Sequence, residues 1–495
     1  MELDEFFKHH GIRPGSRPFD NSKDAKTDTV FTNIMTTSRH NDWGLFFGDE
    51  KTPSTAVIFG DRGSGKTALR LQMLEKMRTY NEEKKQDRVL VVDYVDFNPF
   101  LAAFQSNMER KKKQTQEIFA HWRMHDHLDA ILSLAVTQYI DEYLRDKKKN
   151  KLTPDQQQKM LNLSLLYDSK IRGGQIDRFT QLARLLSVFT IRNLLARKSD
   201  VLFGIAGLFV AIVFIKLALF KFDALQLYLV LAAFITLVAG LIPGWNRSRR
   251  SRKAAQQCFD AIMVLPTDAN EQNSLCCAFR SLPGDRFKNL ILPRAFDGNE
   301  RNAPPAEENR YKYLQFFQDI IVISGYTGIL VFVDQVDEPT MVQGDPKKMW
   351  AFIRSMMDNK LLSVKNMGIK FLLFRGLHKE YQREEDGFLS KSRLDKQNVV
   401  WSLEWGGANL LDLANHRLAD CLVDPGKATD VKSLFDKCLH DRLVSEFGNC
   451  RTPRKLFEFL NTTIKIHISK HPSSEPVYII NETSFELAKK ECRDP

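Results

Sequence analysis

The chain has 495 residues, of which 43% are hydrophobic and 27% charged, and its formal net charge is +11. This composition excludes an intrinsically disordered chain, a collagen-like chain and a small disulfide scaffold, and the length allows about two to four domains. The seven cysteines include no C-x-x-C pair, so they are expected to be reduced thiols and not a zinc site or a disulfide framework.

The chain begins with an extension, expected over residues 1–50. Its opening residues, MELDEFFKHHGIRPG, contain no apolar stretch of the kind that a signal peptide needs. No secretory leader is therefore expected.

A phosphate-binding motif opens the first part of the core, expected over residues 51–100. The segment TAVIFG (55–60) is typical of a short buried strand, GDRGSGKT (60–67) fits G-x-x-x-x-G-K-[ST], and the following residues have helical apolar spacing. Glycines let successive N–H groups turn toward phosphate oxygens, and the helix N-terminus adds partial positive charge. The motif in this context predicts nucleotide binding.

Each polar residue of the motif has an expected task. Lys66 is expected to contact the β- and γ-phosphates, and the Thr67 hydroxyl to be one ligand of Mg²⁺. The residues expected to bind the nucleotide are Gly60, Gly63, Ser64, Gly65, Lys66, Thr67 and Ala68.

A long insert follows the expected strand RVLVVDYVDF (88–97). Its first part, residues 101–200, is expected to be helical because apolar residues recur at three- and four-residue spacing. His121 and His125 share a helix face, but no third ligand lies at a fixed spacing, so a zinc site is not expected.

Residues 201–245 contain two apolar stretches, 201–220 and 225–245, joined by KFDA. Each stretch has the length of ~20 residues that a helix needs to cross a bilayer. Residues 192–253 supply +8 of the net charge of +11, so the basic excess brackets this stretch. The pattern predicts a transmembrane hairpin with both flanks in the cytosol. The alternative is a buried helical hairpin of a soluble domain.

A helical and loop segment (246–309) precedes the second part of the core, expected over residues 310–425. GILVFVDQVDE (328–338) is a continuous apolar run that ends in acids, as expected of a central strand in a parallel sheet. Asp334 is placed to hold Mg²⁺, and Asp337 and Glu338 are candidates to orient or deprotonate an attacking water.

Three later segments complete the predicted core and lid. GIKFLLFR (368–375) and NVVWSLEW (398–405) are expected to be strands, and GNCRTPRKLFEFL (448–460) belongs to a helical lid expected over residues 426–470, before a tail at 471–495. Pro453 suits a first helical position.

Together these segments resemble the additional-strand P-loop NTPases, the group that holds the AAA+, STAND and KAP families. The resemblance implies that Arg375 is a sensor residue and that Arg454 senses the γ-phosphate. Arg417, on the helix after the last strand, is expected to be a surface or capping arginine. Membrane helices inside such a domain resemble the KAP family, whose bacterial members are linked to phage exclusion, but D-Q-V-D-E (334–338) is nearer to the STAND form.

The sequence thus predicts an α/β chain: a parallel-sheet P-loop NTPase core with a helical lid, interrupted by a helical insert that carries the hairpin. We expect a slow ATPase switch in defence or signalling that uses ATP and Mg²⁺, held in the cell (inner) membrane by two spans, with its termini and NTPase domain cytosolic. ATP is favoured because no N-K-x-D motif is present. Expected partners are the lipid bilayer, an unidentified protein effector and a second copy of the chain, since related NTPases supply an arginine finger in trans.

Two alternatives stay open. One is a soluble, origin-recognition-like AAA+ ATPase that acts on nucleic acid, and the low net charge outside 192–253 argues against it. The other is a nucleotide-binding scaffold with little hydrolysis.

Overall fold

The computed structural model describes residues 1–20, 40–111, 118–146, 152–188, 205–213, 215–216, 223–293, 306–424 and 429–493. The chain forms two compact units. Unit 1 contains Met1–Asp96 and Thr327–Pro495, and unit 2 contains Phe97–Tyr326.

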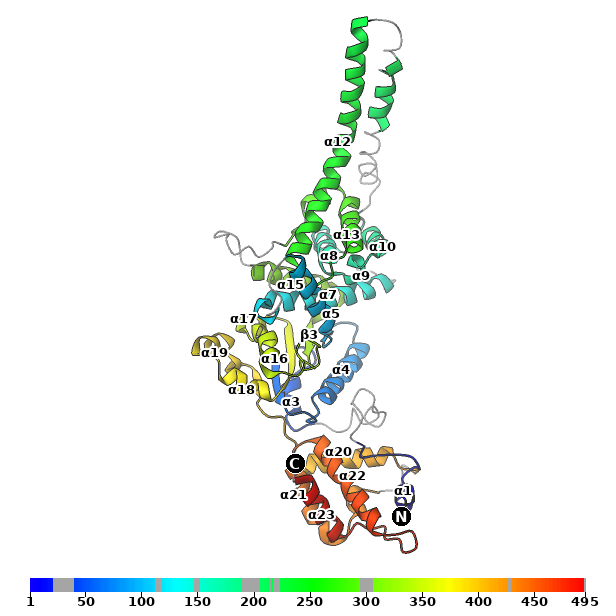
Figure 1. Cartoon of the computed structure of the whole chain (residues 1–495), viewed down its shortest axis with the longest axis vertical. Coiled ribbons are helices and arrows are strands. Elements are labelled where there is room, and N and C mark those ends of the chain that lie inside the picture. Colours follow the sequence, from blue (N-terminus) through cyan, green and yellow to red (C-terminus); the bar gives the residue numbers. More distant parts are fainter. Residues whose placement is uncertain are drawn as a thin grey trace. The chain divides into compact units, whose positions relative to one another are not determined.

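Unit 1 is built on a five-stranded parallel sheet, which confirms the expected α/β class (Figure 1). The strand order is β2-β3-β4-β1-β5. The strands are β1 (Ala56–Gly60), β2 (Arg88–Tyr94), β3 (Tyr326–Val333), β4 (Met367–Phe374) and β5 (Asn398–Val400). Because β4 pairs with both β1 and β3, it separates the strand before the phosphate loop from the strand before Asp334.

Helices cover the two faces of this sheet, and α4 and α16 lie on opposite sides of the strands in Figure 1. On one face, Ile58, Phe332 and Leu372 share a core with Leu69 and Met73 of α4. Strand residues between these point to the other face, since side chains alternate along a strand. The helices of this part are α3 (Trp43–Phe47), α4 (Lys66–Glu83), α16 (Pro346–Ile353), η2 (Arg354–Met356), α17 (Asn359–Leu362), α18 (Gly376–Gln382), α19 (Asp386–Ser392) and η3 (Leu394–Lys396).

The last strand is shorter than the expected 398–405, because β5 ends at Val400. The chain leaves the sheet at Trp401, whose ring stacks on Phe59 with centroids 5.5 Å apart. At Trp405 the backbone N–H donates to the Arg451 carbonyl over 2.9 Å. The end of the expected strand therefore contacts the helices that follow it.

A second, all-helical core within unit 1 joins the N-terminal helix to the C-terminal helices. We call this set of helices the lid. Phe6, Leu410, Leu443, Leu460 and Phe485 are buried in its core. The lid comprises α1 (Leu3–His9), α20 (Gly407–Asp420), η4 (Val431–Leu434), η5 (Lys437–Leu439), α21 (His440–Cys450), α22 (Pro453–Lys470) and α23 (Glu482–Arg493). Pro453 occupies the first turn of α22, and Thr452 caps it by accepting a hydrogen bond from the Lys455 N–H.

The described residues of unit 2 form helices and the loops that connect them, apart from Tyr326 at the start of β3. Its helices are α5 (Asn98–Arg110), α6 (Ile118–His121), α7 (Met124–Arg145), α8 (Pro154–Tyr167), α9 (Ser169–Arg172), α10 (Ile176–Leu185), α12 (Asp223–Ala261), α13 (Ala269–Ser281), α14 (Gly284–Lys288), α15 (Ala306–Ile321) and η1 (Val322–Ser324). At its centre Arg310 forms a fully buried ion pair with Asp129 over 3.0 Å, and the Tyr167 hydroxyl donates to the same carboxylate over 2.7 Å.

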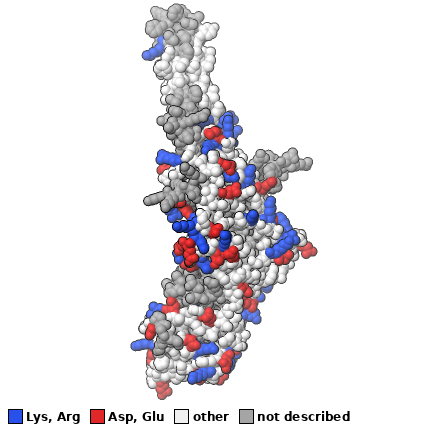
Figure 2. All heavy atoms as spheres, turned by 180° about the vertical axis from the view of Figure 1, so that it is seen from behind, with Lys and Arg blue, Asp and Glu red and all other residues white. Residues whose placement is uncertain are grey.

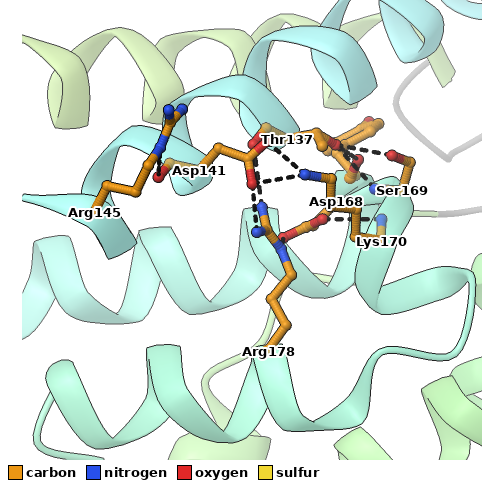
Figure 3. A network of polar contacts seen from close by, with 8 residues as sticks. Thr137, Asp141, Arg145, Asp168, Ser169, Lys170 and Arg178 are labelled. Carbon is orange, nitrogen blue, oxygen red and sulfur yellow. Dashed lines mark hydrogen bonds and ion pairs between the residues drawn. The ribbon is translucent and has the colours of Figure 1, made fainter.

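A polar network ties α7, α9 and α10 of unit 2 together (Figure 3). Arg178 donates to Asp168 over 2.7 Å and to Asp141 over 2.6 Å, and Lys170 also pairs with Asp141 over 2.7 Å. These contacts connect three helices of unit 2 by polar side chains.

The long helix α12 projects from the rest of unit 2 in Figure 1 and continues through the boundary expected at residue 245. Helical residues 205–213 lie against it, since a Cβ on Gly207 would come within 2.8 Å of the Thr236 carbonyl oxygen. Among the residues that the structure describes, no helix is both long and apolar enough to cross a membrane. The expected transmembrane hairpin is thus not supported, and its residues 201–204, 214 and 217–222 lie outside the described part.

Candidate functional site

The phosphate-loop motif forms the connection between β1 and α4. β1 ends at Gly60 and α4 begins at Lys66, so residues 61–65 form the loop. Gly63 has φ +81° and Gly65 has φ +91°, a left-handed backbone that side chains disfavour. The first N–H groups of α4 have no acceptor one turn earlier in the helix, so they are available to an anion.

Lys66 lies back across this loop. Its ammonium donates to the carbonyl oxygens of Gly60 and Asp61, each over 2.9 Å. Burial lowers the pKa of Lys66, and the carboxylates of Asp334 and Asp337 oppose that shift. The cation is therefore held between the loop carbonyls and the acids that follow β3.

Asp334 lies directly after β3 and is only 2% exposed. Arg70 of α4 donates to it over 3.2 Å, and the same guanidinium donates to Asp93 of β2 over 2.6 Å. Burial raises the pKa of Asp334, while Arg70 and a hydrogen bond from Thr67 oppose the shift. Thr67 and Asp334, predicted from distant motifs, are thus in contact.

The other two acids lie in the turn after Asp334. Asp337 forms an ion pair with Arg62 of the phosphate loop over 3.4 Å. Glu338 is exposed and accepts a hydrogen bond from Gln335, which has φ +60°. Both carboxylates face the loop side of the sheet, but each already has a side-chain partner.

Arg454 of the lid and Trp405, just before the lid helix α20, both touch the phosphate loop. The Arg454 N–H donates to the Gly63 carbonyl over 3.3 Å, and a Cβ on Gly63 would lie 2.5 Å from the Cβ of Arg454. The Trp405 indole N–H donates to the Ser64 carbonyl over 2.9 Å. The loop therefore contacts α22 as well as its own strand and helix.

These residues surround one cavity of about 350 Å³ in unit 1. The structure places these predicted residues on its lining: Gly63, Gly65, Lys66, Thr67, Ala68, Asp334, Asp337, Glu338 and Arg454. A volume of this size is within the range of small-molecule sites.

Three predicted residues lie beside the cavity and not on its lining. Gly60 ends β1, and Ser64 is fully buried with a hydroxyl that has no hydrogen-bond partner among the described residues. Arg375 follows β4 and pairs with Asp61 over 3.2 Å and with Glu404 over 3.3 Å. It therefore supports the start of the loop from outside.

Arg417 differs from its expected surface or capping position. It is 5% exposed and lines the cavity. Its Nε donates to the Pro18 carbonyl over 2.7 Å, and its guanidinium lies 4.6 Å from the centre of the Phe457 ring. Its partners come from distant segments, so helical position alone gave no signal of its burial.

Sequence reasoning missed part of the lining altogether. The additional residues are Asp20, Arg62, Leu69, Gln72, Gln335, Trp405, Leu413, Pro453 and Phe457. Arg62 could have been predicted, because it is a cation within the phosphate-loop motif. Trp405 and Phe457 could not, because their sequence pattern is that of ordinary apolar core residues.

The pair Thr67 and Asp334 fits a magnesium ion that is held mainly by phosphate and water. Mg²⁺ in such sites takes one or two protein oxygens and completes its shell with phosphate and water. No group of three or more metal-ligating side chains occurs within the described ranges, so the donor set does not favour a metal bound by protein alone.

The chain matches no family model, no curated protein and no solved structure.

Proposed function

We propose that the chain is an ATP-binding P-loop NTPase that works as a slow switch. One observation carries the proposal: the glycine-rich loop, Lys66, Thr67, Asp334 and Arg454 line a single cavity. The position of β4 between β1 and β3 also supports it, because this is the extra strand after which the additional-strand group is named.

The roles follow from the chemistry of the side chains. The loop N–H groups and the Lys66 ammonium bind the triphosphate, and Arg454 adds a cation from the lid. Thr67 and Asp334 would hold Mg²⁺, which neutralises charge on the phosphates when it is bound. Arg70 contacts Asp334 over 3.2 Å, which orients the carboxylate and favours its ionised form.

The lid makes a switch reasonable on physical grounds. Arg454 contacts the loop through its backbone and belongs to α22, which packs in the lid core through Phe457 and Leu460. A phosphate that binds the loop and Arg454 together stabilises the lid position that brings them together. Nucleotide state would then bias the lid.

The proposal includes attachment to a lipid bilayer through the hairpin of unit 2. Large apolar side chains along it are exposed: 67% for Phe209, 55% for Leu231 and 66% for Phe234. In Figure 2 the described atoms of this segment are mostly uncharged. A contiguous apolar surface of this kind marks a membrane or protein contact.

The nucleotide site is tested with Lys66→Ala and a matched control, Lys76→Ala. Lys76 is on the same helix, half-exposed, and pairs with Glu50 over 3.2 Å. Binding of labelled ATP with Mg²⁺ should be lost in the first variant and kept in the second. Full ATP affinity and turnover in Lys66→Ala would refute the site.

Membrane attachment is tested by fractionation of the expressed full chain, with ATP hydrolysis measured on the membrane pellet. We expect the protein and its activity in the pellet after a carbonate wash. Release into the supernatant by carbonate would contradict the bilayer attachment while leaving the nucleotide site untouched.

A nucleotide-binding scaffold is the second candidate, and one observation favours it. The two acids that are candidates to activate the attacking water already have side-chain partners: Asp337 pairs with Arg62, and Glu338 accepts a hydrogen bond from Gln335. For the scaffold, Glu338→Gln leaves phosphate release at the same low level. For the ATPase, it lowers phosphate release by roughly a hundredfold or more while ATP binding stays.

A further inference from the structure

A hollow of about 710 Å³ lies in unit 2 at the base of the projecting helix α12. Its lining comprises Leu241, Gly244, Trp245, Ser248, Arg249, Arg252, Lys253 and Arg280. All but Arg280 lie on α12, at the three- and four-residue spacing that puts residues on one face of a helix. Arg280 comes from the last turn of α13.

The charge of this hollow is entirely positive. Four of its side chains are cations, all of them exposed, and none of the described lining residues is acidic. None of these cations forms an ion pair with a described residue. Other exposed arginines, such as Arg17 and Arg78, do have carboxylate partners. The cluster therefore presents positive charge that the fold leaves uncompensated.

Along the helix, the lining changes from apolar to basic. Leu241 is 57% exposed and Trp245 is 62% exposed, and the Arg249 guanidinium lies 5.5 Å from the centre of the Trp245 ring. From Leu241 to Arg252 a helix rises about 16 Å, which is comparable to the headgroup region and the outer hydrocarbon of one leaflet. Tryptophan followed by basic residues is the order found where a helix leaves hydrocarbon for headgroups.

The two helices that form the hollow are fixed to each other. Arg247 of α12 donates to the Leu282 carbonyl at the end of α13 over 2.8 Å. Phe259 and Leu275, one from each helix, are both fully buried. Arg280 is thus held beside the α12 cations before any ligand arrives, which reduces the ordering cost of binding.

We propose that this hollow binds the phosphate headgroup of an anionic phospholipid. Arg249, Arg252, Lys253 and Arg280 would contact the phosphate, and Trp245 and Leu241 would lie along the acyl chains. The inference rests on the proposed bilayer attachment and adds a preference for lipid charge. It makes no use of the nucleotide site.

The test is flotation of the full chain with vesicles of phosphatidylcholine alone and of phosphatidylcholine mixed with phosphatidylglycerol. The variant Arg249→Gln/Arg252→Gln is compared with Arg250→Gln/Arg184→Gln, which removes the same charge from exposed positions of unit 2 outside the hollow. A basic residue near an anionic surface contributes roughly fivefold in affinity, so the first variant should lose roughly twenty-five-fold on the mixed vesicles. The control variant should lose less than roughly fivefold in affinity for the mixed vesicles.

Each other outcome has a defined meaning. Equal binding to both vesicle types, or equal loss in both variants, overturns the headgroup site and leaves bilayer attachment standing. No binding of the unmodified chain to either vesicle overturns both. Displacement from mixed vesicles by inorganic phosphate at matched ionic strength assigns the hollow to a free anion. Displacement by a DNA oligonucleotide assigns it to nucleic acid. Either result overturns the proposal. Labelled ATP binding, measured on the same samples, should be the same in every variant.

Discussion

The backbone N–H of Arg454 donates a hydrogen bond to the carbonyl of Gly63 over 3.3 Å, and through it helix α22 contacts the phosphate loop. The contact is close enough that only a hydrogen fits on Gly63, since a Cβ there would lie 2.5 Å from the Arg454 Cβ and 2.8 Å from its Cδ. The loop and the lid therefore cannot be altered independently at this point.

Gly63→Ala is expected to displace α22 from the loop and to weaken ATP binding by roughly tenfold or more, because the new methyl group overlaps a side chain as well as straining the backbone. The matched control is Gly15→Ala, since Gly15 has φ +77° and nothing within 4 Å of an added Cβ. The control bears the backbone strain alone. Isothermal titration of both variants with ATP checks the prediction, and equal affinities would contradict the steric argument.

Trp405 is expected to report nucleotide binding. Its indole donates to the Ser64 carbonyl over 2.9 Å, and its ring is 6% exposed. Phosphate at the loop changes the field and packing around this indole, so intrinsic fluorescence should change on addition of ATP. Trp405→Phe should abolish the change and Trp401→Phe, which removes a 40%-exposed tryptophan, should keep it. A response that survives in Trp405→Phe would assign it to another of the six tryptophans.

Arg70→Met is expected to destabilise unit 1 by about 3–5 kcal/mol, because it leaves the buried Asp334 carboxylate without its cation. Arg70 and Asp334 are each 2% exposed. The control Arg78→Met is on the same helix, where the guanidinium is 60% exposed and pairs with Glu75 over 2.6 Å, and it should cost about 0–1 kcal/mol. Urea unfolding gives both values, and similar costs would show that the buried pair is not needed.

Lys370 gives the sheet a pH dependence. It lies in β4 with no exposed surface, its ammonium donates to the Phe47 carbonyl over 3.0 Å, and burial lowers its pKa to about 7. In the unfolded chain a lysine titrates near about 10.4, so between these values the unfolded state binds more protons and stability rises with pH. The folding penalty from charging Lys370 is complete below about pH 7 and disappears by about pH 10.

The measurement for Lys370 is the thermal midpoint of the chain and of Lys370→Met across that window. The unmodified chain should gain up to about 5 kcal/mol of stability from neutral to alkaline pH, and Lys370→Met should remove that gain. Lys365→Met, at an exposed position of the preceding turn, is the control and should leave it unchanged. An identical pH profile in all three proteins would contradict the buried-lysine account.

The parts of the site that sequence could predict are those formed by neighbours in the chain. The motif from Gly60 to Thr67 carries its own strand, turn and helix signals, and the apolar run before Asp334 is long enough to be recognised as a buried strand. Both depend on local periodicity, which a single sequence contains.

The parts that could not be predicted depend on contacts between distant segments. Arg417 is buried because Pro18 and Phe457 meet it, and Trp405 is a loop contact because Ser64 lies 341 residues away in the chain. The same holds for Trp401, which follows β5 and stacks on Phe59, a residue of a distant strand. The spacing of residues within one segment does not predict contacts with distant segments.

The shortness of β5 also bears on how copies of this chain could associate. β5 is one edge of the sheet: Asn398–Val400 pair there with β1, and the Leu403 N–H adds one further bond, to the Phe59 carbonyl over 2.7 Å. So short an edge strand offers few main-chain donors and acceptors to a foreign strand, which disfavours edge-to-edge aggregation at this edge. Any ordered assembly through this side of unit 1 must then rely on complementary side chains and not on extension of the sheet.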